Sequence, residues 1–254
     1  MAKYIKRFET VTAQTQYVQS MNYIEPYISA VNDTDNMGDN VQYNQYNIRE
    51  QYIEKTYIEN HATGAAYINT GILTTSNLGV EIKARVAYNG TNNGKESIFF
   101  GASKSVYFKD GNNFCIEKSG GNIICTVAKK QPNSDSIGQY SNYTNPFIIQ
   151  YNYNGQGEAI LYNQNRVEEF RISSTASGVP TDLNCYLFCR NINNSQDTSY
   201  SHPIRVYYCR MWQGTTLVRD FVPVLKISTQ KYGLYDNVTH TFFGSNNSTD
   251  FFGG

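Results

Sequence analysis

Acidic side chains are the first residues in this sequence that could do chemistry. Hydrolysis of a glycosidic bond with retention of configuration needs two carboxyl groups about 5 Å apart on one face of the fold. The pair that comes closest is Glu168 and Glu169, but consecutive residues of a strand point to opposite faces. Glu81 and Glu117 each stand alone in strand-like segments, where we expect a solvated position. The sequence therefore predicts no catalytic residues and a chain that is not an enzyme.

Cysteine and histidine provide no clear alternative motif. Cys185 and Cys189 lie close together, but no second cysteine or histidine pair occurs at the spacing of a zinc finger. Residues 32–40 carry several aspartates, yet no glutamate closes the series at the distance that a calcium loop requires, so we interpret them as a polar loop. We expect no metal and no cofactor. The five cysteines are predicted to be buried free thiols.

Composition narrows the choice of partners. Lysine plus arginine and aspartate plus glutamate number 21 each among 254 residues, so the net charge is zero. Without a basic stripe, the attraction that nucleic-acid binders exert on phosphates has no evident source. No segment approaches the roughly 20 apolar residues of a membrane span, and the first residues lack the apolar run of an export signal. We therefore expect a soluble protein that binds neither nucleic acid nor membranes.

Period-two patterns indicate β-strands. Apolar and polar residues alternate over residues 80–86 and 147–154, which places the apolar side chains on one face of each strand. These apolar positions are Val80, Ile82, Ala84, Val86, Phe147, Ile149, Tyr151 and Tyr153. Dipeptides that tolerate positive φ occur at Asn89-Gly90, Asp110-Gly111, Gly120-Gly121 and Asn154-Gly155. Short strands joined by such turns predict an antiparallel β-sandwich or barrel.

The chain divides into two parts by composition. Residues 1–62 are poor in glycine and in clean alternation, whereas turn signals and period-two patterns recur over residues 63–254. Within the first part, residues 10–27 could form a short helix that ends near Pro26. We interpret residues 43–59 as a connector whose Tyr and Ile side chains contact a partner chain. The predicted organisation is an N-terminal arm followed by one all-β domain.

The C-terminal segment resembles a known family. Its characteristic runs are Arg219-Asp220-Phe221-Val222-Pro223 and Gly233-Leu234-Tyr235-Asp236, with an opening strand at Ala66-Tyr67-Ile68-Asn69-Thr70-Gly71-Ile72. These runs are similar to concanavalin A-like (laminin-G-like) jelly-roll domains of gut bacterial and phage surface proteins. The resemblance spans residues 64–254 and implies a jelly-roll β-sandwich.

The residues of this signature also have structural roles to fill. Arg219 and Asp220 can pair with or cap neighbouring strand ends. Pro223 fits an edge strand or a strand terminus, and Gly233 permits a turn before Leu234 enters the core. We therefore interpret the signature as structural and not as a catalytic set.

The N-terminal arm resembles a second group of proteins. Tyr4-Ile5-Lys6-Arg7-Phe8 and the later run Tyr23-Ile24-Glu25-Pro26-Tyr27 are similar to N-termini of virion proteins of crAss-like and other Bacteroides phages. The resemblance implies a head fibre or capsid-decoration protein on the virion surface, made in the host cytoplasm and commonly trimeric. By this resemblance the anchor contacts to a capsid or tail protein are Tyr4, Ile5, Arg7 and Phe8. The alternative is an ordinary terminal strand that packs on its own domain.

Glycan binding is the remaining hypothesis for the domain. Sugars are held by aromatic faces and by planar amide or carboxylate groups, and residues 139–145 and 191–200 supply both types. A host surface polysaccharide is the expected partner, although the sequence does not single out its binding residues. Three alternatives stay open: a glycan-binding module outside any particle, a glycan-cleaving enzyme, and an inert surface of a virion protein.

Overall fold

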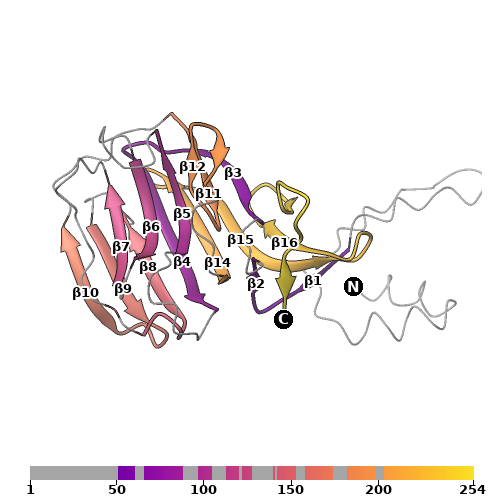
Figure 1. The fold of residues 1–254 in the computed structure, drawn as a ribbon, viewed down its shortest axis with the longest axis horizontal. Coiled ribbons are helices and arrows are strands. Elements are labelled where there is room, and N and C mark those ends of the chain that lie inside the picture. Colours follow the sequence, from indigo (N-terminus) through magenta and orange to yellow (C-terminus); the bar gives the residue numbers. More distant parts are fainter. Residues whose placement is uncertain are drawn as a thin grey trace, which may run out of the picture.

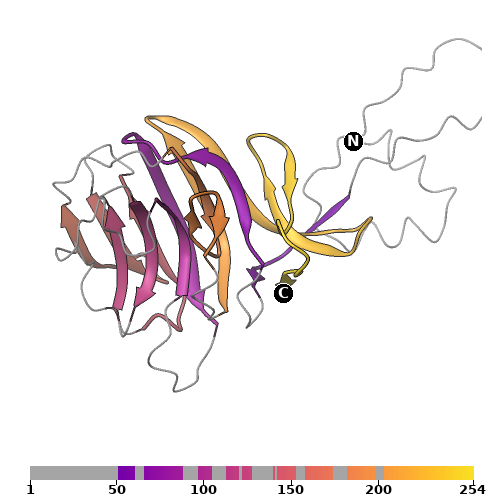
Figure 2. The same ribbon diagram turned by 45° about the horizontal axis from the view of Figure 1, so that its top comes forward.

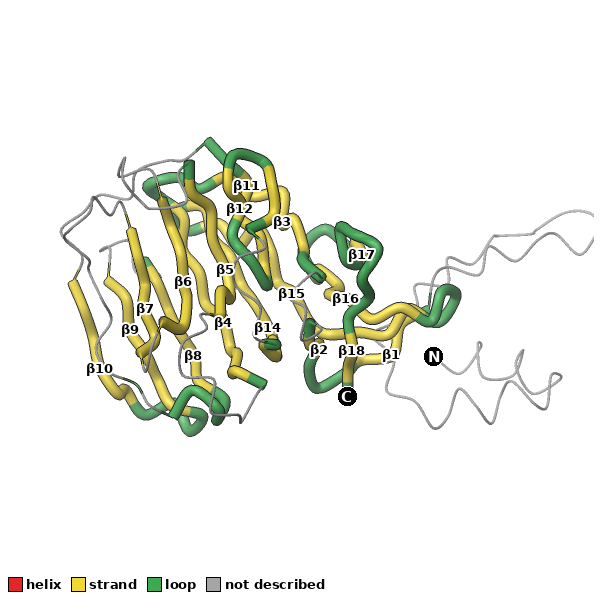
Figure 3. Tube along the Cα trace, in the orientation of Figure 1, coloured by secondary structure: helices red, strands yellow, loops and turns green. Residues whose placement is uncertain are grey.

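The computed structural model describes residues 51–60, 66–87, 97–104, 113–119, 122–127, 140, 142–152, 158–173, 182–197 and 203–254. These residues form two packed β-sheets, seen as two layers in Figures 1 and 2. The described residues include strands and loops and no helix (Figure 3). They also contain no helix of the length and apolarity that a membrane crossing requires. The predicted fold class, an antiparallel jelly-roll β-sandwich, is confirmed.

The larger sheet is the one that carries the polar sites described below. Its strands follow in the order β10 (Glu168–Ser173), β9 (Glu158–Asn163), β8 (Phe147–Tyr151), β4 (Leu78–Val86), β14 (Ile204–Gln213), β15 (Thr216–Lys226), β16 (Lys231–Asp236) and β17 (Thr241–Phe243). Three short strands extend it, namely β1 (Tyr52–Glu54) on β15, β2 (Ile58–Glu59) on β14, and β18 (Phe252–Gly253) on β2.

The smaller sheet covers one face of the larger. Its order is β13 (Ser195–Gln196), β12 (Asn191–Ile192), β5 (Ser97–Ser103), β11 (Asn184–Leu187) and β3 (Ile68–Leu73), while β6 (Asn113–Ser119) pairs with β5 and β7 (Asn122–Val127) pairs with β6. Phe99 on β5 meets Phe147 on β8 edge to face, with ring centroids 5.3 Å apart, and Phe114 on β6 meets Tyr151 at 4.9 Å. Aromatic pairs of this kind join the two layers.

The predicted alternation places side chains in the core. The described residues that were predicted to be apolar positions are all buried in one hydrophobic cluster shared by both sheets, namely Val80, Ile82, Ala84, Val86, Phe147, Ile149 and Tyr151. The four cysteines whose side chains are described are buried free thiols, in agreement with the prediction. The charged and polar residues between them on β4 and β8 face the opposite side of the larger sheet, which we call its outer face.

Asp236 explains why the C-terminal signature contains charged residues. Its carboxylate is fully buried and accepts hydrogen bonds from the backbone N–H groups of Asp220 (2.8 Å) and Val238 (3.1 Å) and from the Thr239 hydroxyl (2.7 Å). Arg219 approaches the same carboxylate at 3.6 Å and donates to the backbone carbonyl of Thr70 (3.0 Å) on β3. The signature therefore ties β15, the turn after β16 and β3 together, as the predicted pairing role required.

Pro223 and Gly233 have different roles from the predicted ones. Pro223 lies inside β15, between the end of its pairing with β14 at Phe221 and the start of its pairing with β1 at Val224. A missing N–H is tolerated at that break. Gly233 lies inside β16 and not at a turn, and a Cβ there would lie 2.4 Å from the Phe243 carbonyl oxygen. Close approach of two strands, and not turn formation, requires this glycine.

Residues 52–59 of the predicted arm join the larger sheet through β1 and β2. Tyr52 packs against Tyr235, with ring centroids 4.9 Å apart, and Ile58 is fully buried in the core. These side chains contact the chain's own sheet, where we had expected a partner chain, because β14 and β15 leave strand edges open to them. The rest of the arm, its expected helix, the anchor residues and the four turn dipeptides lie outside the described residues.

Candidate functional site

A pocket lies at one end of the larger sheet, where β8 begins and β9 ends. It has a volume of about 160 Å³ and opens between the loop before β8 and the hairpin that joins β9 to β10. We call it the amide pocket, and its lining residues are Tyr140, Asn142, Asn145, Asn163, Gln164, Asn165 and Glu169. Five of these seven side chains are carboxamides, each able to donate and to accept hydrogen bonds.

The β9–β10 hairpin forms one wall of the pocket. The Asn163 side-chain oxygen accepts hydrogen bonds from the backbone N–H groups of Asn165 (2.9 Å) and Val167 (3.1 Å), which fixes the turn from within. Arg166 N–H donates to the Asn163 carbonyl at 3.0 Å, and Arg166 has a left-handed φ of 59°. The Asn163 amide nitrogen donates to Glu169 Oε1 at 2.8 Å. The hairpin therefore presents Asn163 and Glu169 in a fixed arrangement.

The loop before β8 forms the opposite wall. Strand β4 holds it, because the Val86 N–H donates to the Tyr143 carbonyl (2.8 Å) and Arg85 Nη1 donates to the Thr144 carbonyl (3.2 Å). Tyr140 packs its ring against Phe147 in the core, with centroids 5.8 Å apart. Burial raises the pKa of Tyr140, and the nearby Glu169 carboxylate adds to the rise. The phenol is therefore a neutral group at the pocket wall, and its ring is not available for stacking on a ligand.

The described lining residues of the pocket offer side-chain groups for hydrogen bonding. The side-chain amides of Asn142, Asn145, Gln164 and Asn165 are exposed, and none has a partner among the described residues. Glu169 is the one carboxylate that lines the pocket among the residues the structure describes. Glu168 does not line the pocket, and its carboxylate pairs with Arg171 at 2.9 Å. This agrees with the predicted divergence of the two adjacent glutamates.

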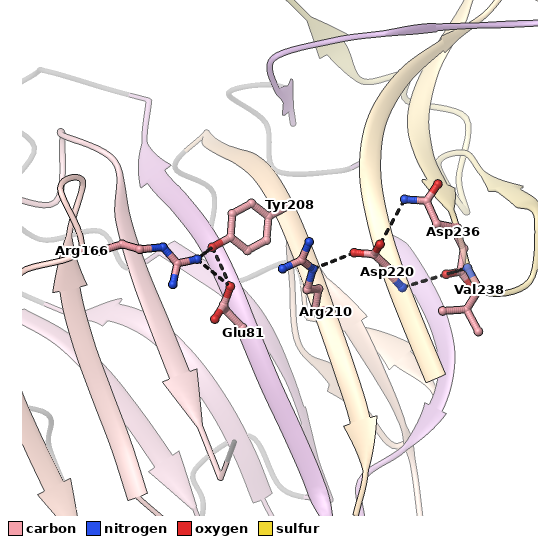
Figure 4. Close-up of polar contacts among 8 residues, drawn as sticks. Glu81, Arg166, Tyr208, Arg210, Asp220, Asp236 and Val238 are labelled. Atoms are coloured by element: carbon pink, nitrogen blue, oxygen red, sulfur yellow. Dashed lines mark hydrogen bonds and ion pairs between the residues drawn. The ribbon is translucent and has the colours of Figure 1, made fainter. Parts of the chain in front are cut away.

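A second polar group lies on the outer face of the larger sheet and corrects one prediction. Glu81 is buried, with 4% of its side chain exposed, where we expected a solvated carboxylate. Its Oε1 accepts from the Tyr208 hydroxyl (2.7 Å) and from Arg166 Nη2 (3.3 Å) (Figure 4). The Gln150 side-chain amide donates to Oε2. Glu117 is also buried, next to the Cys115 thiol. Side chains from neighbouring strands and from the β9–β10 hairpin bury Glu81. The sequence pattern of one strand cannot predict burial by residues of other strands.

A β-bulge on β14 presents two consecutive tyrosines on this face. The register with β4 shifts between Val206 and Tyr208, so Tyr207 is an extra residue in β14 with no partner in β4. Because of this extra residue, the side chains of Tyr207 and Tyr208 lie on the same face of the sheet. Lys83 Nζ lies 5.6 Å from the Tyr207 ring centroid, and the Arg210 guanidinium lies 5.5 Å from that of Tyr208. Cation–π contacts of this length hold each cation over a ring.

Arg210 completes the outer-face group. Its Nε donates to Asp220 Oδ1 at 2.8 Å (Figure 4). Burial and the hydrogen bond to Glu81 raise the pKa of Tyr208, so its hydroxyl stays protonated and donates. We call Glu81, Arg166, Tyr208 and Arg210 the Tyr208 site.

Sequence reasoning found part of the amide pocket. Three lining residues come from the amide-rich residues 139–145, but Asn163, Gln164 and Asn165 were missed because their turn contains no glycine or proline. At the end of the described part of the second amide-rich segment, Asp197 forms a buried ion pair with Arg190 at 2.6 Å. The asparagines of that turn, Asn193 and Asn194, have positive φ.

Fold and site together define a β-sandwich protein with a polar rim pocket. Neither a protein-family model nor a curated protein matches the sequence. Solved structures with similar folds include the K499G mutant of NanB sialidase from Streptococcus pneumoniae (12% identity, TM-score 0.41), which the chain matches over 65% of its own length and 27% of that chain. This chain thus spans about a quarter of that sialidase.

Two smaller domains are similar over most of their length. The Ruminococcus gnavus IT-sialidase CBM40 bound to alpha2,3 sialyllactose shares 9% identity with a TM-score of 0.34, over 61% of this chain and 88% of that domain. The carbohydrate recognition domain of Emp47p shares 13% identity with a TM-score of 0.31, over 65% of this chain and 78% of that domain. Sequence identities and TM-scores this low do not indicate a shared function, so the function is inferred from this chain's own residues.

Proposed function

We propose that this protein is a glycan-binding module that holds sugar hydroxyls in the amide pocket. The observation that carries the proposal is the convergence of five carboxamides, one carboxylate and one tyrosine hydroxyl from two segments that β8 and β9 separate in the sequence. Sugar hydroxyls donate and accept at once, and carboxamides do the same in one plane. The pocket is smaller than those that enclose drug-sized ligands, so it suits a single sugar unit of a longer chain.

We further propose that the pocket binds without cleaving. Retaining hydrolysis needs a second carboxyl group about 5 Å from the first. Glu169 has the Asn163 amide as its neighbour in the pocket, and Glu168 is engaged by Arg171. A lone, hydrogen-bonded carboxylate is a ligand for hydroxyl groups.

A glycan array of neutral oligosaccharides, probed with the full chain, tests the proposal. We expect binding by the wild type and a loss of roughly tenfold or more in the double variant Asn145→Ala, Gln164→Ala, because each removes hydrogen bonds worth about 1 kcal/mol net. Both side chains are exposed and make no described contact, so the variant should fold like the wild type. The matched control is Asn77→Ala, which removes an exposed amide in the turn before β4. Absence of binding on the array, or equal binding by the double variant, would reject the proposal.

Attachment to a virion remains a separate proposal. The resemblance of the arm to phage virion proteins implies a head fibre or decoration protein, and residues 1–50 that carry it lie outside the described residues. Glycan binding by the domain and attachment through the arm are compatible roles, and each has its own test.

A further inference from the structure

The Tyr208 site exposes positive charge and hides negative charge. The side chains of Arg166 and Arg210 are 59% and 46% exposed, whereas those of their partners Glu81 and Asp220 are 4% and 19% exposed. Both guanidinium groups contact the same tyrosine. Arg166 Nη2 lies 3.2 Å from the Tyr208 hydroxyl (Figure 4), and the Arg210 guanidinium lies 5.5 Å from the centroid of its ring. A ligand approaching from solvent therefore meets two guanidinium groups around one aromatic ring.

The backbone of Arg166 is a second, independent observation. In a hairpin of this kind a turn is followed by one residue in the left-handed region, and glycine occupies that position at the lowest cost. Arg166 occupies it instead, with φ of 59°. A long cationic side chain held at a strained backbone position suggests a use for that side chain.

The two arginines also retain hydrogen-bonding capacity. Arg166 uses Nη2 for Glu81 and Tyr208, and Arg210 uses Nε for Asp220. Arg166 Nη1 and both Nη atoms of Arg210 have no partner among the described residues. Guanidinium groups present these N–H donors in a planar fork that matches the two oxygens of a carboxylate or sulfate.

We propose that the Tyr208 site binds the carboxylate or sulfate groups of an acidic polysaccharide, with Arg166 and Arg210 as the anion-binding residues. The tyrosine pair on the β14 bulge, Tyr207 and Tyr208, lies beside them as the surface for the sugar ring. This site uses none of the lining residues of the amide pocket, so it stands or falls independently of the proposed function.

The charge balance favours an acidic polysaccharide over a nucleic acid. Affinity for nucleic acid comes from many lysine and arginine contacts to a continuous phosphate backbone. Here the whole chain has zero net charge, and the site offers two exposed guanidinium groups with two carboxylates behind them. That arrangement suits an isolated anionic group on an otherwise neutral polymer.

Three polymers with one backbone test the proposal: carboxymethyl dextran, dextran sulfate and plain dextran. Binding to the full chain is measured by biolayer interferometry at 50 and 300 mM salt. We expect binding to one or both acidic polymers, at least tenfold weaker binding to plain dextran, and weaker binding at high salt. The two acidic polymers distinguish a carboxylate ligand from a sulfate ligand.

Two variants test whether the acidic polymers bind at the Tyr208 site, namely Arg166→Gly and Arg210→Gln. Arg166→Gly removes the guanidinium while relieving the left-handed backbone, so it should fold and yet bind at least tenfold more weakly. Arg210→Gln leaves Asp220 with its bond from Asn237 and should weaken binding similarly. The matched control is Arg171→Gln. Arg171 is also an exposed arginine of the larger sheet, but among the described residues it pairs with Glu158 and Glu168 and not with a tyrosine, so its loss should leave binding unchanged.

Several outcomes would overturn the proposal. They are equal binding of all three dextrans, no binding of either acidic one, unchanged binding by both site variants, or an equal loss in Arg171→Gln. Tighter binding of polyphosphate than of either acidic dextran would also overturn it, since that would indicate a general polyanion surface. The variant Asn145→Ala, Gln164→Ala distinguishes failure of the amide pocket from failure of the Tyr208 site. It should bind acidic dextran normally, because neither residue belongs to the Tyr208 site.

Discussion

Replacing Tyr208 by phenylalanine removes one hydroxyl from the centre of the Tyr208 site and keeps the ring. The hydroxyl donates to Glu81 Oε1 at 2.7 Å, and that carboxylate is 4% exposed. Hydrogen bonds to charged groups contribute about 1.5–3 kcal/mol, and Glu81 keeps its bonds from Arg166 and Gln150 in the variant. We therefore expect the free energy of unfolding to fall by about 2 kcal/mol at pH 7. For a chain of this size that corresponds to a lowering of Tm by roughly 4–8 °C.

The pH dependence of this loss provides a sharper test. The pKa of Tyr208 is raised in the folded protein above its ordinary value of 10.0. A raised folded pKa means that the stabilisation is complete below pH 10, and that it is lost above pH 10 as the unfolded chain gives up its phenolic proton first. The advantage of the wild type over Tyr208→Phe should therefore shrink by about 1.4 kcal/mol per pH unit above pH 10. Other tyrosines titrate equally in both proteins and cancel in the difference.

Urea unfolding of both proteins at pH 7, 10 and 11, followed by far-ultraviolet circular dichroism, measures this difference. The expected gap is about 2 kcal/mol at pH 7 and below about 1 kcal/mol at pH 11. A difference between the two proteins that stays constant from pH 7 to pH 11 would show that folding does not raise the pKa of the Tyr208 hydroxyl, and would refute the reasoning. Because Tyr208→Phe keeps both guanidinium groups, its binding to acidic dextran should fall less than that of Arg166→Gly.

Four further outcomes are expected. Gly233→Ala should lower the free energy of unfolding by about 3 kcal/mol or more in chemical denaturation, because the new Cβ lies 2.4 Å from the Phe243 carbonyl oxygen; a loss below about 1 kcal/mol would contradict the close strand contact. Asp236→Asn should cost about 2 kcal/mol, since the amide nitrogen can no longer accept a hydrogen bond from Thr239 or attract Arg219, and an unchanged Tm would refute its role. The four described thiols should react with Ellman's reagent only on unfolding, because burial raises the pKa of each; fast reaction of all five cysteines in the native protein would be the contrary result. Light scattering should report a trimer for the full chain and a monomer after deletion of residues 1–50, whereas a full-length monomer would count against the virion role that the arm's resemblance implies.

Much of the fold could be predicted because it depends on local patterns. Alternation over residues 80–86 placed four apolar side chains in the core, and the structure buries all four. The charged signature at Arg219 and Asp220 was expected to join strand ends, which it does through Asp236 and Thr70. Residues 139–145 were singled out for their aromatic and amide side chains, and three of them line the pocket.

Other features depend on what lies across the sheet, and no single-strand pattern reports that. Gly233 looked like a turn residue until the closeness of Phe243 showed why only glycine fits. Glu81 looked solvated because its own strand leaves it on the polar face. Its burial comes from Tyr208 and Arg166, which are more than 80 residues away along the chain.

The sequence by itself determined which face of each strand is apolar, because side chains alternate with a period of two whatever the neighbouring strand is. It also determined that the chain has zero net charge. Only the tertiary structure decided the contents of the two sites, since sheet order brings β4, β14 and the β9–β10 hairpin together. A bulge on β14 places two consecutive tyrosines on the outer face, and the turn between β9 and β10 brings Arg166 to the Tyr208 hydroxyl.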